Sequence, residues 1–182
     1  MQNRLITLWE RTTKAERSEG ASWYPEAHRF ADYLAFWTNR PIEQTCGVIA
    51  ALSPQLSWER NCEAAEAFIK HEPIPGVLQA SIRRAGRILR GAAPSATAFP
   101  LRSCPKTNSF YHNLLDPDDP RYVTIDRHAA SAGLGRSAKR FDYWQIEAAY
   151  REAAQAVGVL PSAFQATLWL CQRKGWQGSL DS

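Results

Sequence analysis

The sequence predicts an all-α fold, and three observations support this. Apolar residues recur at steps of three and four through most of the chain, which is the spacing of one helix face. Serine, aspartate and proline stand where such segments begin, and glycine stands where they end. No stretch is rich in strand-forming residues and no internal repeat occurs. With 182 residues and 45% hydrophobic composition, we expect one compact domain over residues 1–182, divisible into a central helical lobe of 42–115 and a second lobe of 1–41 plus 116–182.

The first three helices are expected over residues 24–40, 42–52 and 57–71. Pro25 suits the first turn of the first helix, whose apolar positions follow helical steps. The second segment is almost continuously apolar, so periodicity alone allows a buried strand or a buried helix. Its alanines, with Glu43 and Cys46, favour a helix. Ser57 is placed to be the N-cap of the third helix.

An amphipathic helix is expected over residues 76–90. Its predicted inner stripe consists of Leu78, Ile82, Ala85 and Leu89. The outer face carries arginines, namely Arg83, Arg87 and Arg90, with Arg84 on its flank. Such a charged face is either solvated or turned toward phosphates, and the sequence leaves both interpretations open.

The second half of the chain is expected to alternate loops with short helices. A connector rich in Ala, Ser, Thr and Pro covers 91–105, and a short helix over 106–115 ends in a turn at 116–120. An extended segment, 123–125, leads to Asp126, which caps a helix closing at Gly133 or Gly135. The last two helices are expected over 143–157 and from Pro161 to just before Gly175.

Charge and cysteine content narrow the class of protein. The net charge of +4 and the pI near 9.0 favour polyanionic partners. No apolar run has the length of a signal peptide or a membrane span, so we expect a cytoplasmic protein without a membrane partner.

Because the His, Cys and acidic residues do not have the spacing of metal ligands, we expect no metal and no cofactor. The cysteines form no C-x-x-C pair and are expected to be reduced, buried thiols: Cys46, Cys62, Cys104 and Cys171.

The strongest local signal for chemistry is the segment 122–130, in which a short apolar extended stretch delivers Asp126 to the start of a helix. The unpaired N–H groups and the dipole of a helix N-terminus stabilise a carboxylate there. Helix capping alone is one explanation of this pattern.

Lys106, at the start of its own short helix, adds a second group that could take part in chemistry. A desolvated amine can attack C1′ of a nucleotide, while a carboxylate stabilises the positive charge that grows on the sugar. These two residues are the predicted catalytic pair.

The linker between the second and third helices carries an amide at Gln55. An amide in such a short linker can enter the gap left by an extruded base and hydrogen-bond the orphaned partner base. A polar loop residue without that role fits the same pattern.

Taken together, these motifs resemble a known family. The order Leu52-Ser53-x-Gln55, then Asn61, then Lys106-Thr107, then Val123-x-x-Asp126-x-His128 resembles the endonuclease III branch of the helix-hairpin-helix DNA glycosylases. The resemblance implies a two-lobed helical bundle of that type and a monomer that binds double-stranded DNA with one nucleotide flipped. It also implies that Gln55 is the wedge, Lys106 the Schiff-base nucleophile and Asp126 the catalytic carboxylate, with Ser53, Asn61 and Thr107 as further DNA-binding residues. Because only Cys171 lies near the C-terminus, no iron–sulfur cluster is expected.

The chain departs from this family at the hairpin before the lysine. Family hairpins have glycines, which let backbone N–H groups approach a phosphate closely. Here the segment 101–105 has no glycine and ends in a proline, which lacks an N–H. Arg102, or the face of Arg83 and Arg87, is expected to supply phosphate contacts instead.

Aromatic and histidine residues are candidates for the base pocket. Trp23 and Tyr24 could stack a flipped base, and packing in the core is the alternative for each. His112 and His128 could shuttle protons, or each could be a hydrogen-bonded structural histidine.

Three hypotheses about function follow. The first is a DNA glycosylase, with lyase activity if Lys106 forms a Schiff base. The second is an enzyme that modifies DNA bases on the same scaffold, as glycosylase-like phage proteins are thought to do. The third is a non-catalytic helical module that binds DNA or protein. A DNA-associated protein of a bacterial or phage-infected cell fits the first two hypotheses.

Overall fold

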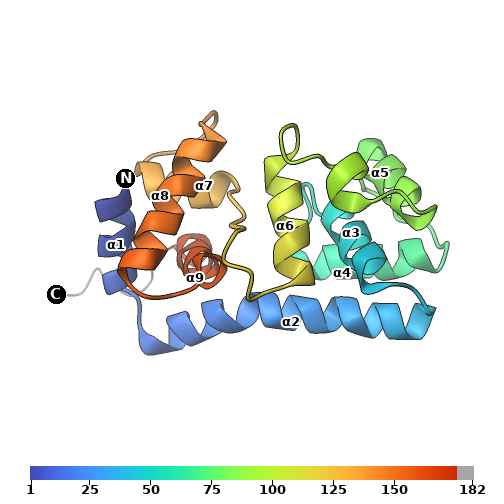
Figure 1. The fold of residues 1–182 in the computed structure, drawn as a ribbon, viewed down its shortest axis with the longest axis horizontal. Helices are drawn as coiled ribbons and strands as arrows, with labels where there is room; N and C mark the ends of the chain where they lie inside the picture. Colours follow the sequence, from blue (N-terminus) through green and yellow to red (C-terminus); the bar gives the residue numbers. More distant parts are fainter. Residues whose placement is uncertain (176–182) are drawn as a thin grey trace. The chain divides into compact units, whose positions relative to one another are not determined.

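The computed structural model describes residues 1–175, and within them the fold is all-α, as predicted. No β-strand occurs in this part of the chain. Figure 1 shows the order of the elements. They are α1 (Gln2–Glu10), α2 (Lys14–Thr38), α3 (Ile42–Leu52), α4 (Trp58–Ile69), α5 (Gln79–Leu89), the π-helical turn η1 (Pro94–Ala98), α6 (Pro105–Leu115), α7 (Arg127–Leu134), α8 (Tyr143–Ala156) and α9 (Pro161–Arg173).

The chain forms two compact units. The first consists of Met1–Glu26 with the described part of Pro117–Ser182, and the second of Ala27–Asp116. The helix α2 contributes residues to both units. Residues 27–41 were expected in the lobe formed by the two ends of the chain, but they belong to the second unit together with the predicted central lobe.

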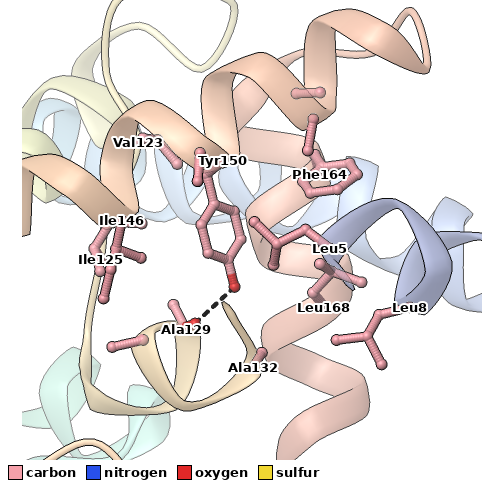
Figure 2. Packing of buried hydrophobic residues seen from close by; sticks show 14 of the residues in the cluster. Leu5, Leu8, Val123, Ile125, Ala129, Ala132, Ile146, Tyr150, Phe164 and Leu168 are labelled. Carbon is pink, nitrogen blue, oxygen red and sulfur yellow. Dashed lines mark hydrogen bonds between the residues drawn. The ribbon is translucent and has the colours of Figure 1, made fainter. Parts of the chain in front are cut away.

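The core of the first unit forms where α1, α7, α8 and α9 pack on one another. Tyr150 is fully buried there, with the ring of Phe164 edge-on at 5.9 Å. Its hydroxyl donates to the carbonyl of Ala129 at 2.9 Å, so the one polar atom of the ring is satisfied (Figure 2). Burial raises the pKa of Tyr150.

The core of the second unit is centred on α3, which contacts α4, α5 and α6. Every residue from Thr45 to Leu52 is buried, which explains the unbroken apolar run in the sequence. Gly47 is required by close packing, because a Cβ there would lie 2.7 Å from Cγ of Pro94 and 3.1 Å from Cγ2 of Ile88. The prediction of a helix rather than a strand is confirmed for this segment.

The N-terminal helices differ from the prediction. The helix expected over 24–40 begins at Lys14, and Pro25 lies inside it rather than in its first turn. A capping box starts it: the backbone N–H of Thr13 donates to Oε2 of Glu16 at 2.7 Å, and the backbone N–H of Glu16 donates to Oγ1 of Thr13 at 3.2 Å. The hydrogen bond from the Thr13 backbone lowers the pKa of Glu16. The helix α1 was not predicted.

The inner face of α5 also differs from the prediction. Ser81, Ala85 and Ile88 are the buried residues, whereas Leu78 precedes the helix and is 40% exposed. Ile82 and Leu89 are only half-buried. Small residues at 81 and 85 let α5 approach α3 closely, so shape rather than hydrophobicity selects the buried face.

The other predicted helices are confirmed to within two residues at most ends. Ser57 caps α4 by accepting from the backbone N–H of Arg60, and Gly135 closes α7 with a φ of 69°. Of the four cysteines, all free, Cys46 and Cys171 are buried, while Cys62 and Cys104 are only half-buried. No helix within residues 1–175 combines the length and apolar character needed to cross a bilayer.

Candidate active site and basic surfaces

Asp126 in the first unit is held by hydrogen bonds to both of its carboxylate oxygens. The buried residues Val123 and Ile125 lead the chain into the N-cap position of α7. There, Oδ1 of Asp126 accepts from the backbone N–H of Ala129 at 2.8 Å, and Oδ2 accepts from Nε1 of Trp169 at 2.9 Å. The predicted cap is confirmed, and the half-buried carboxylate has a fixed orientation.

Trp169 is the centre of a small aromatic cluster next to this carboxylate. The ring of Trp23 meets it edge-on at 5.9 Å, and the guanidinium of Arg173 lies 4.8 Å from its ring centroid. Trp23 is half-buried. Tyr24 is buried, and its hydroxyl donates to Oε1 of Gln165 at 3.1 Å, so its ring has no open face on which a base could stack. Tyr24 therefore belongs to the core.

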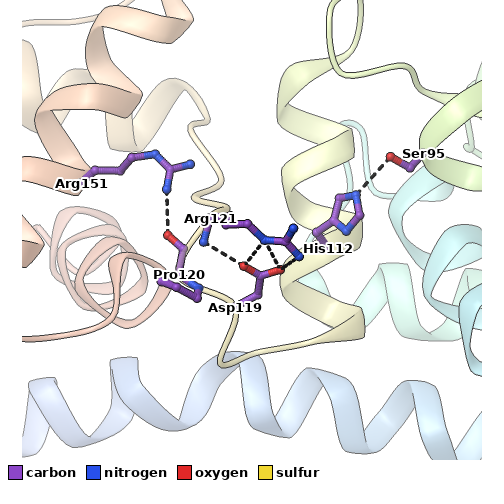
Figure 3. Close-up of polar contacts among 6 residues, drawn as sticks. All are labelled: Ser95, His112, Asp119, Pro120, Arg121 and Arg151. Atoms are coloured by element: carbon purple, nitrogen blue, oxygen red, sulfur yellow. Dashed lines mark hydrogen bonds and ion pairs between the residues drawn. The ribbon is translucent and has the colours of Figure 1, made fainter.

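Charged contacts fix the turn that precedes the extended segment (Figure 3). The buried carboxylate of Asp119 accepts from the backbone N–H of Arg121 at 2.9 Å and pairs with its guanidinium at 2.6 Å. Arg151 of α8 donates to the carbonyl of Pro120 at 2.7 Å. The sequence predicts only a turn here, because Arg151 is distant in the chain from the residue that it contacts.

Lys106 in the second unit is exposed in the first turn of α6, and Thr107 beside it is half-buried. The preceding turn uses its amides internally: the carbonyl of Pro100 accepts from the backbone N–H groups of Ser103 at 3.0 Å and Cys104 at 2.9 Å. Pro105 has no N–H to donate. The N–H groups of Ser103 and Cys104 are therefore engaged within the turn, whereas in the family that the chain resembles hairpin amides are expected to hold a phosphate. Arg102 is an exposed side chain in the same turn.

His112 belongs to a polar network that fastens η1 to α6. Its Nε2 lies 3.1 Å from Oγ of Ser95 (Figure 3). Nδ2 of Asn108 donates to the same Oγ at 2.8 Å and to the carbonyl of Phe99 at 3.1 Å. This arrangement fits the structural interpretation of His112.

The linker between α3 and α4 holds Gln55 in an unusual backbone conformation. Its φ of 68° lies in the left-handed region, and its side chain is exposed. Ser53 ends α3 and donates its hydroxyl to the carbonyl of Ala50 at 2.9 Å. Asn61 is 2% exposed, and its Oδ1 has no hydrogen-bond partner among the described residues, so it is a buried rather than a surface residue. The positive φ of Gln55 is uncommon for a residue other than glycine, and such backbone conformations are often found in functional loops.

The predicted arginine face of α5 lines a groove in the second unit. Arg83, Arg87 and Arg90 are exposed. Together with Arg84, also of α5, and Phe68 of α4, they border a cavity of about 760 Å³. Each guanidinium carries five N–H donors, so such a face can donate several hydrogen bonds to an anion. The surface suits phosphate contacts.

His128 lines a second pocket, which lies wholly in the first unit. Its volume is about 600 Å³, and Arg4, Arg11, Arg127 and Arg136 line it with His128. These arginines are not predicted from the sequence, because α1 was not expected as a helix and nothing local groups Arg4 and Arg11 with the start of α7.

No set of three or more His, Cys, Asp or Glu side chains within residues 1–175 is arranged to hold a metal ion.

Comparison with curated proteins finds no match, and comparison with solved structures finds none either. Residues 1–176 match the model of DUF7178, a family of unknown function. Because this match covers almost the whole sequence, the chain belongs to the family DUF7178.

Proposed function

We propose that this protein is a DNA glycosylase of the helix-hairpin-helix type, in which Asp126 is the catalytic carboxylate and Lys106 the nucleophile. The observation that carries the proposal is the double hydrogen bonding of Asp126 by Ala129 and Trp169. A carboxylate held in one orientation before any substrate binds needs no rearrangement to stabilise a sugar cation. The motif order described above supports the choice of family.

The first step assigned to the two residues breaks one bond and forms one. Nζ of Lys106, as the neutral amine, bonds to C1′ of the flipped nucleotide, while the bond between C1′ and the base nitrogen breaks. The base leaves with the bonding electron pair and takes up the proton that the attacking nitrogen gives up. In a second step the C1′–O4′ bond breaks, O4′ takes up a proton, and the bond between Nζ and C1′ becomes the protonated imine. Asp126 stabilises the positive charge that develops on the sugar. Because the amine of Lys106 is exposed, substrate has to cover it for the attack to proceed.

The surfaces of the second unit support a nucleic-acid substrate. The arginine face of α5 offers charge to the phosphate backbone. The exposed side chain and left-handed backbone of Gln55 suit a residue that enters the base stack.

Borohydride trapping tests the proposal. The protein is incubated with duplexes carrying a panel of modified bases or an abasic site, and the imine between Lys106 and the sugar is reduced to a stable adduct. Lys106→Gln should abolish the adduct. The control Lys139→Gln, which removes an exposed lysine from the loop between α7 and α8, should trap as well as the parent. Trapping by Lys106→Gln at the parent level would refute the assignment of the nucleophile.

A second candidate is a helical protein that binds nucleic acid without catalysis, and the exposure of Lys106, which a nucleophilic amine would lose by desolvation, favours it. Product analysis separates the candidates. A free base with an abasic or nicked strand supports the glycosylase, an intact strand with an altered base supports a base-modifying enzyme on the same scaffold, and an unchanged duplex supports the binding protein.

A further inference from the structure

The pocket lined by α1 and α7 in the first unit is strongly cationic. Four of its lining residues are arginines, Arg4, Arg11, Arg127 and Arg136, and no carboxylate from residues 1–175 lines it. None of the four guanidinium groups forms an ion pair with a carboxylate within residues 1–175. Concentrating like charges in one concavity is unfavourable unless an anion neutralises them.

Helical spacing explains how the arginines come to one place. Arg11 is the C-cap residue of α1, seven residues after Arg4, and its backbone is still helical, so both side chains lie on the same face of that helix. Arg127 and Ser131 are four residues apart on α7, which packs against α1. The faces of both helices contribute to the lining, and Arg136 is added by the loop that follows α7.

The pocket is built before any ligand arrives, because its walls are fixed by hydrogen bonds. Nε of Arg4 donates to the carbonyl of Ala132 at 2.9 Å. Its guanidinium lies over Gly135, where a Cβ would stand 2.8 Å from Cζ of Arg4 and where φ is 69°. The loop after α7 is held in turn by Ser131, whose hydroxyl accepts from the backbone N–H of Ala138 at 3.1 Å.

We propose that this pocket binds a phosphate ester of nucleotide size. Arginine forks recognise phosphate through paired, charge-assisted hydrogen bonds. A volume of about 600 Å³ lies within the range of small-molecule sites, roughly 300–1,000 Å³, so it exceeds what inorganic phosphate alone fills. Ser131 and Ser137 add hydroxyl groups to the lining, and His128 adds a ring that can donate or stack. The proposal stands on the first unit alone and does not depend on the glycosylase function.

Calorimetric titration with thymidine 5′-monophosphate tests the proposal, with thymidine as the probe that lacks phosphate. The nucleotide should bind and thymidine should not. The double variant Arg127→Ala/Arg136→Ala should bind the nucleotide at least about tenfold more weakly, because each lost charge-assisted pair corresponds to roughly a tenfold change. The guanidinium groups of both residues make no hydrogen bond within residues 1–175, so this variant should fold normally, and circular dichroism checks that it does.

Arg140→Ala is the matched control, since Arg140 is exposed close to the same loop but does not line the pocket. It should leave the affinity within about twofold of the parent, as expected for a charge that makes no contact. Lys106→Gln should do the same, so loss of the proposed catalytic activity in that variant leaves this proposal intact.

One further probe, a short single-stranded oligonucleotide, distinguishes the sources of the phosphate. Tighter binding of a short single-stranded oligonucleotide than of the mononucleotide, lost in Arg127→Ala/Arg136→Ala, identifies the phosphate as part of a nucleic acid and supports the site. Equal affinity for the mononucleotide and for an oligonucleotide identifies a free nucleotide and also supports it. Failure of every phosphate-bearing probe to bind, or unchanged binding in the double variant, overturns the proposal.

Discussion

The indole N–H of Trp169 donates to Oδ2 of Asp126 at 2.9 Å, while Oδ1 of the same carboxylate accepts the backbone N–H of Ala129 at 2.8 Å. An asparagine at 126 has only one oxygen, so it can satisfy the cap or the indole but not both. We expect Asp126→Asn to lower the free energy of unfolding by about 1–2 kcal/mol, the usual effect of one lost buried partner, as measured by urea denaturation.

The control for Asp126→Asn is Asp142→Asn, in the N-cap of α8. There a single oxygen, Oδ1, accepts from the backbone N–H groups of both Trp144 and Gln145. Asparagine retains that oxygen, so this variant should stay within about 0.5 kcal/mol of the parent. Equal effects of the two substitutions would mean that the bond from Trp169 contributes nothing.

Gln55→Gly tests whether the left-handed backbone at residue 55 serves binding. Glycine adopts a φ of 68° without the strain of a Cβ, so the variant should be more stable in urea by up to about 1 kcal/mol. If Gln55 is the wedge, the same variant should bind duplex DNA more weakly in a fluorescence anisotropy titration. His71→Gly relieves a similar φ of 61° and should stabilise the protein without changing DNA affinity. Undiminished DNA binding by Gln55→Gly would remove the wedge role.

Arg87→Ala tests the arginine face of α5. Each phosphate contact contributes about one unit to the slope of log K against log salt. We therefore expect weaker DNA binding and a slope reduced by about one unit, measured by anisotropy at several salt concentrations. Arg29→Ala removes an exposed arginine of α2 outside the groove and should leave the slope unchanged. An unaltered slope in Arg87→Ala would show that this face is merely solvated.

Gly20→Ala should destabilise the protein and Gly86→Ala should not, although both replace glycine inside a helix. Alanine is ordinarily better there by about 1 kcal/mol. At Gly20, however, a Cβ would lie 2.6 Å from both N and Cα of Thr167 in α9, and backbone atoms cannot move aside. We expect thermal or urea denaturation to show a loss of about 1–3 kcal/mol for Gly20→Ala. At Gly86 the nearest atom is Nη1 of Arg90 at 3.3 Å, a flexible end, so Gly86→Ala should be neutral or stabilising.

Stability should fall at alkaline pH because buried thiols resist ionisation in the folded state. Burial raises the pKa of Cys46 from 9.0 to about 12, and desolvation likewise raises the pKa of Cys171 and of Tyr111 to about 12. The unfolded chain therefore releases protons first as the pH rises. The neutral thiols contribute fully to the free energy of unfolding below pH 9. Above pH 9 this contribution is lost progressively, at up to about 1.4 kcal/mol per pH unit for Cys46.

Urea midpoints measured between pH 8 and pH 10.5 check this expectation. Cys46→Ala removes one of the titrating groups, so its midpoint should fall less steeply with pH than that of the parent. A midpoint that is constant across this range, or a slope unchanged by Cys46→Ala, would contradict it.

Helices with a start signal and a stop signal were predictable from the sequence alone. Ser57 and Asp126 cap their helices, and Gly135 ends α7, because these roles depend only on neighbouring backbone groups. The start of α2 was missed because Pro25 resembled a first-turn proline, although the Thr13–Glu16 capping box was present in the sequence. The buried face of α5 depends on how closely α3 approaches, which no local pattern encodes.

The candidate site was predictable only in its local part. An apolar extended stretch followed by aspartate indicates a cap, and Asp126 is one. Its second partner, Trp169, is 43 positions away in the chain, so only tertiary packing brings the indole to it. The cationic pocket depends in the same way on α1 and α7 coming together.

The extended segment that leads to Asp126 has no neighbouring strand within residues 1–175, and the side chain of Tyr143 takes the place of one. Its hydroxyl donates to the carbonyl of Val123 at 3.0 Å and accepts the N–H of Ile125 at 3.4 Å. Because Val123 and Ile125 are buried, main-chain groups there without a partner would cost free energy. One phenol satisfies both groups, so an irregular segment can pass through the core of the first unit without a sheet. Loss of that oxygen would leave a buried donor and a buried acceptor unpaired just before the N-cap of α7.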